Sequence, residues 1–102
     1  YSKKHVDPNW RMPKIIESVC EYFEKCKDDM FSRDRHVDMV HPRQVLHYLL
    51  YNYTRMTKEQ IGDYFNIDHS TIVHSTNKIT FQRRKYSNID EELNIIESLI
   101  LS

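Results

Sequence analysis

The chain has 102 residues, of which 39% are hydrophobic and 29% charged, so it is long enough for one domain with a core and too apolar to be disordered. Fifteen lysines and arginines balance fifteen aspartates and glutamates, and this zero net charge makes the whole chain a poor general binder of polyanions. One glycine, three prolines and no run of 18 apolar residues argue against a hairpin-rich all-β fold and a membrane span, and predict a small all-α domain.

The first part of the chain predicts a tail over residues 1–12 and a domain over residues 13–102. The tail lacks the apolar core of a signal peptide, so we expect a cytoplasmic protein. Pro13 suits the first turn of a helix, and helical spacing follows in Ile15, Ile16, Val19, Cys20, Tyr22 and Phe23. Lys27–Phe31 fits one further turn, and Ser32–Val37 is predicted to be a basic loop.

Two helices are predicted in the middle of the chain. Pro42 is expected to begin a long one, whose apolar stripe is Val45, Leu46, Leu49, Leu50 and Tyr53. Thr57 and Gln60 then form a capping-box pattern, which predicts the start of a short helix that ends at Asn66. This helix carries Ile61, Tyr64 and Phe65.

Two further helices complete the prediction. Asp68 is a good cap for a helix that extends to about Arg84, and the basic run Arg83–Lys85 suits a solvated helix end. Asn88 or Asp90 is expected to begin the last helix, with an inward stripe of Ile89, Leu93, Ile96, Leu99 and Ile100. The fold class is therefore an all-α bundle of about six helices, and the family resemblance given below implies a Trp-repressor-like architecture for it.

Thr57–Lys85 has the outline of a helix-turn-helix: a short capped helix, a tight turn and a longer helix. At 100° per residue, an inward Ile72 places Thr76 and Ile79 on the same buried face of the longer helix. The opposite face is polar and carries Ser70, His74 and Asn77, with Thr71 and Lys78 at its edge. Such a row of hydroxyls, an imidazole and a cation suits the major groove of DNA.

The charges are unevenly distributed along the chain. Residues 33–85 carry nine basic and five acidic side chains, a net of +4, and the flanks carry the balancing −4. Five of the six histidines lie in the same span and are expected to add positive charge near an anionic surface. A positive centre with acidic flanks can bind DNA on one face, and an ordinary mixed surface is the alternative.

No metal, cofactor or catalytic site is expected. Cys20 and Cys26 would point about 120° apart on a helix, which suits two buried or half-exposed thiols rather than a disulfide. His69 and His74, five residues apart, share no helix face. Asp68–Ser70 holds the residue types of a catalytic triad, but consecutive helical residues point about 100° apart and cannot relay a proton in line.

A resemblance to a known family is carried by Asp68–His74 (DHSTIVH), followed by Lys78-Ile79. These residues are similar to the signature of the DNA-binding domain of DnaA, the bacterial replication initiator. The resemblance covers about residues 13–102, and continues backward through Ile61–Phe65 (IGDYF), Pro42–Gln44 (PRQ), Arg33–Arg35, Asp29–Ser32 (DMFS) and Tyr22-Phe23.

The resemblance implies a site for each class of DNA contact. An arginine at the place of Arg35 enters the minor groove, where A·T-rich DNA concentrates negative potential. Base contacts in the major groove are implied for Asp68, to a cytosine amino group, for His69, and for Ser70, to a thymine. Backbone contacts or support of the reading helix are implied for Arg33, Arg43, Gln44, Thr71, His74 and Lys78. The implied partner is duplex DNA with a DnaA-box-like site, bound by a monomer.

The chain departs from the family pattern around these positions. Only Asn66 and Ile67 precede the Asp-His pair, which makes the turn one residue shorter and removes a phosphate-directed arginine. Ser70 lacks the methyl group that a threonine would place against a thymine, so readout there should be weaker. Tyr51 stands where the family often has a basic residue, and Asp34 interrupts the basic loop.

Two alternatives concern the role of the chain. It holds no G-x-x-x-x-G-K-[ST] motif, so the ATPase of the initiator cannot reside in it. We expect a stand-alone, nucleoid-associated DNA-binding protein, for example of a phage or mobile element, with a role in replication initiation or its regulation; a domain of a longer initiator is the alternative. The other function considered is a protein-interaction module that engages a replication or transcription protein through acidic residues of the last helix, namely Asp90, Glu91, Glu92 and Glu97.

Overall fold

The computed structural model describes residues 11–31 and 37–101. This part of the chain forms six α-helices and no strand, which confirms the predicted all-α class. They are α1 (Met12–Phe23), α2 (Lys27–Phe31), α3 (Val37–Tyr53), α4 (Lys58–Phe65), α5 (His69–Lys85) and α6 (Ser87–Leu101). None of the described helices has the length and apolar character needed to cross a membrane.

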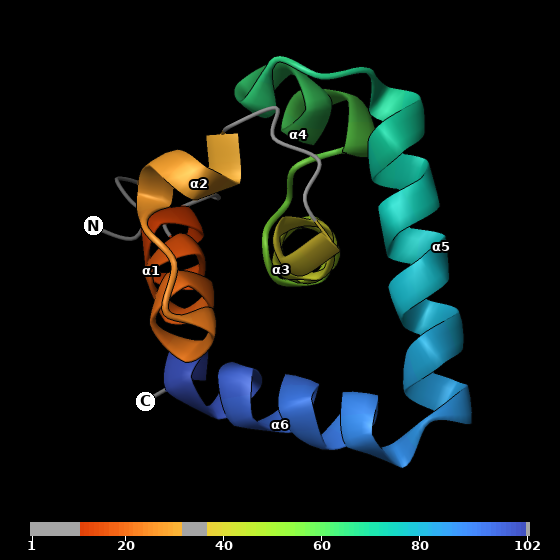
Figure 1. The fold of residues 1–102 in the computed structure, drawn as a ribbon. Helices are drawn as coiled ribbons and strands as arrows, with labels where there is room; N and C mark the ends of the chain where they lie inside the picture. The colour runs from red at the N-terminus through yellow and green to blue at the C-terminus, as the bar shows by residue number, and fades with distance from the viewer. Residues whose placement is uncertain (1–10, 32–36, 102) are drawn as a thin grey trace, which may run out of the picture.

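Helix α3 is the centre of the fold. Figure 1 shows it end-on, with α1 and α2 on one side, α5 on the other, and α4 and α6 closing the remaining two sides. Every side chain from Gln44 to Leu50 is buried, and most of these residues are apolar. The sequence therefore explains the central position of α3, because a helix that is apolar on several faces is packed on all sides. The fully buried partners that surround it are Ile15 and Val19 of α1, Ile61 of α4, Ile72 and Ile79 of α5, and Leu93 and Ile96 of α6.

The start of α3 corrects one prediction. The helix already begins at Val37, and Pro42 lies inside it rather than at its first turn. A proline inside a helix removes one backbone hydrogen bond, at a cost of about 3 kcal/mol. Tertiary contacts hold the turn before it: Met39 is buried, and His41 lies 2.6 Å from the Glu92 carboxylate and packs edge-on against Phe23. Packing therefore overrides the local preference of the proline.

Two smaller boundaries also differ from the prediction. Helix α6 begins at Ser87, slightly before the predicted start, and of its predicted stripe Leu93, Ile96 and Ile100 are buried while Ile89 and Leu99 are half-buried. Helix α1 ends at Phe23, so Cys20 and Cys26 do not share a helix, as their predicted angle assumed. Both thiols are free; that of Cys26 is exposed and donates a hydrogen bond to Asp29.

Candidate nucleic-acid interface

The helix-turn-helix predicted over Thr57–Lys85 is present as α4 and α5. The Thr57 hydroxyl accepts the Gln60 backbone N–H at 3.1 Å, and the Gln60 side chain accepts the Thr57 N–H at 2.9 Å, which confirms the capping box. Asn66 ends α4 in the left-handed conformation, with φ 57°. The backbone N–H groups of Asn66 and Ile67 then donate to the carbonyls of Asp63 and Gly62, so the predicted tight turn is closed by its own backbone.

Gly62 sets the distance between the two helices. A Cβ atom at this position would lie 2.9 Å from the Ile67 carbonyl oxygen and 3.2 Å from the backbone N and Cα of His69. Such a contact is too short for any residue with a side chain, so the turn and the first residue of α5 rest directly on α4. The chain's single glycine therefore fixes the position of the N-terminal end of α5.

Asp68 caps α5, as predicted. One carboxylate oxygen accepts the Ser70 N–H at 3.4 Å, and the other accepts the Ser70 hydroxyl at 3.0 Å. These two bonds lower the pKa of Asp68, first through the Ser70 hydroxyl and then through its N–H, so the carboxylate remains ionised near neutral pH. The ring Nδ1 of His69 also lies 3.3 Å from the same carboxylate. All three side chains are exposed and held together at the tip of the helix.

The two faces of α5 match the predicted pattern. Ile72, Thr76 and Ile79 are buried, together with Ser75, which the prediction did not include. The outward side chains are exposed, as expected for Ser70, Thr71, His74, Asn77 and Lys78. The polar row is thus a solvent-facing surface and not part of the bundle core.

A buried histidine supports this helix from α3. His47 Nδ1 is joined to the Ser75 hydroxyl by a 3.1 Å hydrogen bond. Burial, with the nearby Arg43 charge as a smaller cause, lowers the pKa of His47 to about 4, so the ring is neutral near pH 7. The expectation that all the central histidines add charge is therefore wrong for His47. His47 lies outside the predicted apolar stripe of its helix, and its polar partner comes from another helix.

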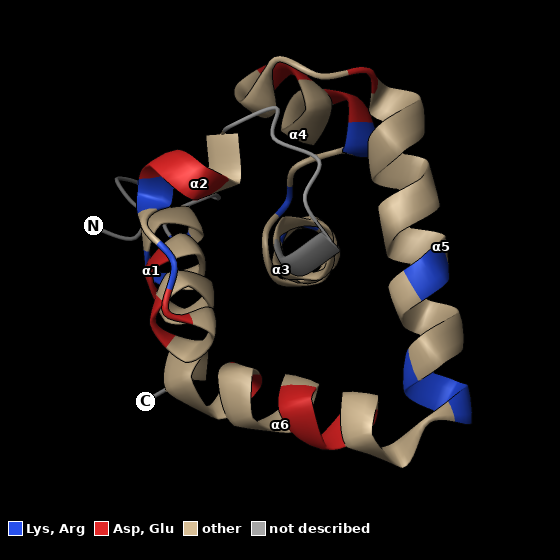
Figure 2. Ribbon diagram, in the orientation of Figure 1, with Lys and Arg blue, Asp and Glu red and all other residues tan. Residues whose placement is uncertain are grey.

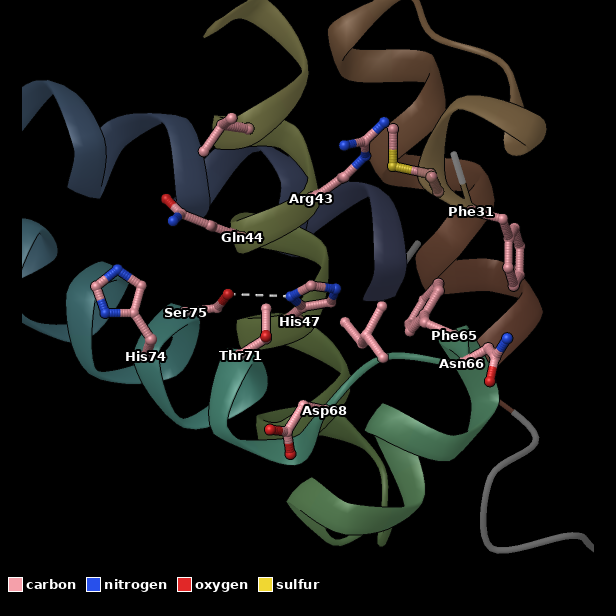
Figure 3. A pocket seen from close by; sticks show the side chains of 13 residues that line it. Phe31, Arg43, Gln44, His47, Phe65, Asn66, Asp68, Thr71, His74 and Ser75 are labelled. Atoms are coloured by element: carbon pink, nitrogen blue, oxygen red, sulfur yellow. Dashed lines mark hydrogen bonds between the residues drawn. The ribbon is translucent and has the colours of Figure 1, made fainter. Parts of the chain in front are cut away.

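A groove of about 410 Å³ runs beside α5, between α3, the end of α2 and the helix-turn-helix turn. It is lined by several of the side chains predicted for DNA contacts, which Figure 3 shows on α3 and at the start of α5: Arg43, Gln44, Asp68, Thr71 and His74. We call it the Arg43 groove. Arg43 Nε donates to the Asp29 carbonyl at 3.0 Å, which orients the guanidinium at its wall.

Other predicted residues lie away from this groove. His69, Ser70 and Lys78 are exposed on α5 but do not line it. Arg33 and Arg35, predicted for backbone and minor-groove contacts, lie outside the described residues.

The basic end of α5 differs from the prediction of a solvated helix end. The Arg83 guanidinium makes two hydrogen bonds of 2.9 Å to the Glu97 carboxylate, and further bonds to Asp90 (2.8 Å), Asn94 (2.9 Å) and the Tyr48 hydroxyl (3.2 Å). The bonds to Glu97 are the main cause of a raised pKa of Arg83. In Figure 2 the basic end of α5 lies at the corner where α5 meets α6, and acidic positions follow along the α6 ribbon. Arg83 therefore joins three helices, whereas Arg84 and Lys85 are exposed.

The acidic residues of α6 were considered above as a surface for a protein partner, but most of them are paired within the chain. Asp90 and Glu97 are bonded to Arg83, and Glu92 lies 2.6 Å from His41. Three of the four carboxylates thus stabilise the fold, which weakens the argument for a protein-docking helix.

Comparisons with known proteins agree with the geometry. A family model described as the bacterial dnaA protein helix-turn-helix matches residues 12–79. The chromosomal replication initiator protein DnaA of Burkholderia multivorans is 30% identical over 87 residues, and that of Leptothrix cholodnii is 29% identical over the same length. Each alignment covers 84% of this chain and 17% of the relative, so the chain spans less than a fifth of the curated relatives it matches.

Proposed function

The chain belongs to the family of the bacterial DnaA helix-turn-helix, and from this premise we propose that it binds duplex DNA sequence-specifically at DnaA-box-like sites. The observation that carries the proposal is the exposed polar row of α5 beside the Arg43 groove. The row offers hydroxyls, an imidazole and a cation on a rigid helix, and its N-terminal end is fixed by Gly62 and Asp68. A helix with this exposed face fits the major groove of B-form DNA.

Base contacts are assigned to the N-terminal end of α5. Asp68 remains an acceptor for a cytosine amino group, because a carboxylate has more lone pairs than the two bonds to Ser70 occupy. His69 and Ser70 are exposed next to it and reach neighbouring base edges. The bond between the Ser70 hydroxyl and Asp68 orients both side chains before DNA arrives.

Backbone contacts are assigned to the sides of α5. Arg43, Gln44, Thr71 and His74 line one groove, which one phosphate strand can follow, and Lys78 extends the contact by one helical turn. The roles of Arg33 at the backbone and Arg35 in the minor groove rest on the family resemblance alone. The proposed biological role, in replication initiation or its regulation, likewise rests on the relatives' names.

The test is the selection of bound duplexes from a random pool, followed by titration of the best site and a scrambled duplex over a salt series. We expect the selected site to bind at least tenfold more tightly than the scrambled one. His69→Ala and Ser70→Ala should each reduce this discrimination, by about 1–3 kcal/mol for a good base contact. Lys78→Ala should weaken both duplexes alike and lower the salt slope by about one. Equal affinity for both duplexes, unchanged by His69→Ala and Ser70→Ala, would reject specific readout.

A further inference from the structure

A second groove lies where the end of α3 meets the first residues of α4 and α5. Of the residues expected to contact DNA, only His69 lines it. Its volume is about 410 Å³, and its walls include Tyr51 from α3, Lys58 and Glu59 from the start of α4, and His69 and Val73 from α5. We call it the Lys58 groove. The Lys58 ammonium lies 4.9 Å from the centroid of the Tyr51 ring, a cation–π contact that holds the charge at the groove.

The two grooves lie on opposite sides of α5. Thr71 and Ser75 line the Arg43 groove, and His69 and Val73 line the Lys58 groove. At 100° per residue these pairs are centred roughly 160° apart around the helix axis. The exposed residues Ser70 and Asn77 project from the face between them.

This arrangement matches the geometry of a major groove. A helix inserted there has base edges in front of its exposed face and one sugar–phosphate strand on each side. The Arg43 groove faces one strand, and the Lys58 groove then faces the other. We propose that Lys58, positioned by the ring of Tyr51, contacts a phosphate of the second strand, an inference that rests on the proposed DNA binding.

In this proposal Tyr51 supports DNA binding, although it stands where the family often has a basic residue. The aromatic ring carries no charge, but its face attracts an ammonium group and restricts the flexible lysine side chain. Tyr51 and Lys58 together thus present one cation at the place where α3 and α4 meet. Tyr51 is a positioning residue, and Lys58 is the contact.

Glu59 allows a second substitution whose expected effect on DNA binding is opposite to that of Lys58→Met. Its exposed carboxylate is on the same wall and repels a phosphate bound to Lys58. Lys58→Met should therefore weaken binding, and Glu59→Gln should strengthen it. The effect must be the same on selected and scrambled duplexes, because a phosphate contact carries no sequence information.

The experiment measures the salt dependence of binding for the whole chain with the selected duplex. We expect Lys58→Met to weaken binding about three- to tenfold and to lower the salt slope by about one, and Lys58→Arg to restore most of the loss. Tyr51→Leu should weaken binding less than Lys58→Met does, since the charge remains but loses its support. Lys14→Met, on α1 on the far side of α3, is the matched control and should change neither quantity.

Single methylphosphonate replacements along both strands locate the contact. The phosphate whose neutralisation weakens the wild type but not Lys58→Met should lie on one strand, and the phosphate identified in the same way with His74→Gln should lie on the other. Both phosphates on one strand, or equal salt slopes for Lys58→Met and Lys14→Met, would overturn the proposal while DNA binding stands. A wild type that binds no duplex would overturn the proposed function and this inference with it.

Discussion

The two ends of α5 use polar and charged side chains for opposite purposes. At the N-terminal end, Asp68, His69 and Ser70 are exposed, and their mutual contacts only orient them. At the C-terminal end, Arg83 is bonded to side chains of α3 and α6. The position of the first end depends on close backbone contacts and apolar burial, whereas the second end is held by ion pairs.

The difference shows how a basic run should be interpreted. Arg83, Arg84 and Lys85 are equivalent by composition, but the partners of Arg83 belong to its own chain and leave its guanidinium unsuited to a phosphate contact. Lys78, five residues before Arg83, is exposed. Arg83 should therefore control the stability of the fold and Lys78 the salt dependence of DNA binding. Neither should replace the other.

The largest effect is expected for Arg83→Met. This change leaves the Glu97 carboxylate, which is 15% exposed, without its cation, and should reduce the free energy of unfolding by about 3 kcal/mol. Urea unfolding followed by circular dichroism measures it. Arg84→Met, at the exposed neighbouring position, is the control and should change stability by less than about 0.5 kcal/mol. Equal losses in the two variants would show that the ion-pair network is not what holds this end of α5.

Gly62→Ala tests the opposite end of the helix. The added methyl group would meet backbone atoms of Ile67 and His69, which cannot move aside without shifting the start of α5. We expect a loss of about 2 kcal/mol in the free energy of unfolding, in the range of overpacked cores. Asp63→Ala, on the exposed face of the same helix, should not destabilise the fold.

Gly62→Ala and Arg83→Met should also differ in their effects on DNA. In conditions where each variant is fully folded, only Gly62→Ala should reduce discrimination between selected and scrambled duplexes, because only it displaces Asp68–Ser70. Wild-type discrimination by folded Gly62→Ala would mean that the N-terminal end is not fixed by this contact.

Acidification should weaken the support between α3 and α5. His47 has a pKa of about 4 in the folded protein and an ordinary value of 6.5 when unfolded, so the unfolded chain binds more protons between these two pH values. Stability should therefore fall as the pH drops from 6.5 towards 4, by about 1.3 kcal/mol between pH 7.5 and pH 5.5. His47→Gln removes this titration. The free energies of unfolding of the wild type and of His47→Gln, measured between pH 7.5 and pH 5.5, should converge at the acid end. The same pH dependence in both proteins would contradict a buried neutral His47.

The fold followed from the sequence wherever a signal was local. The capping box at Thr57, the cap at Asp68 and the 3.6-residue spacing from Ile72 to Ile79 each depend on residues within two turns, and all three are confirmed. Pro42 gave the wrong helix start because contacts with α1 and α6 outweigh its local preference.

The site was predictable on its exposed side and not on its buried side. Arg83, His47 and the Lys58–Tyr51 contact escaped prediction because their partners lie on other helices and have no fixed spacing in the sequence. The outward row of α5 needed only one inward residue as a reference. Polar residues in a sequence thus reveal a surface more readily than the partners that hold it in place.

The smallest expected effect concerns the turn that leads to the N-terminal end of α5. Glu24, after α1, adopts nearly the same left-handed conformation as Asn66, with φ 55° against 57°. This conformation is unfavourable for most side chains and tolerated by asparagine. Glu24→Gly should therefore stabilise the fold by about 0.5–1 kcal/mol, and Asn66→Gly by less, as measured by urea unfolding. A larger gain at Asn66 than at Glu24 would mean that strain is concentrated in the turn of the DNA-binding motif, and that this end of α5 is held under tension rather than in a relaxed backbone turn.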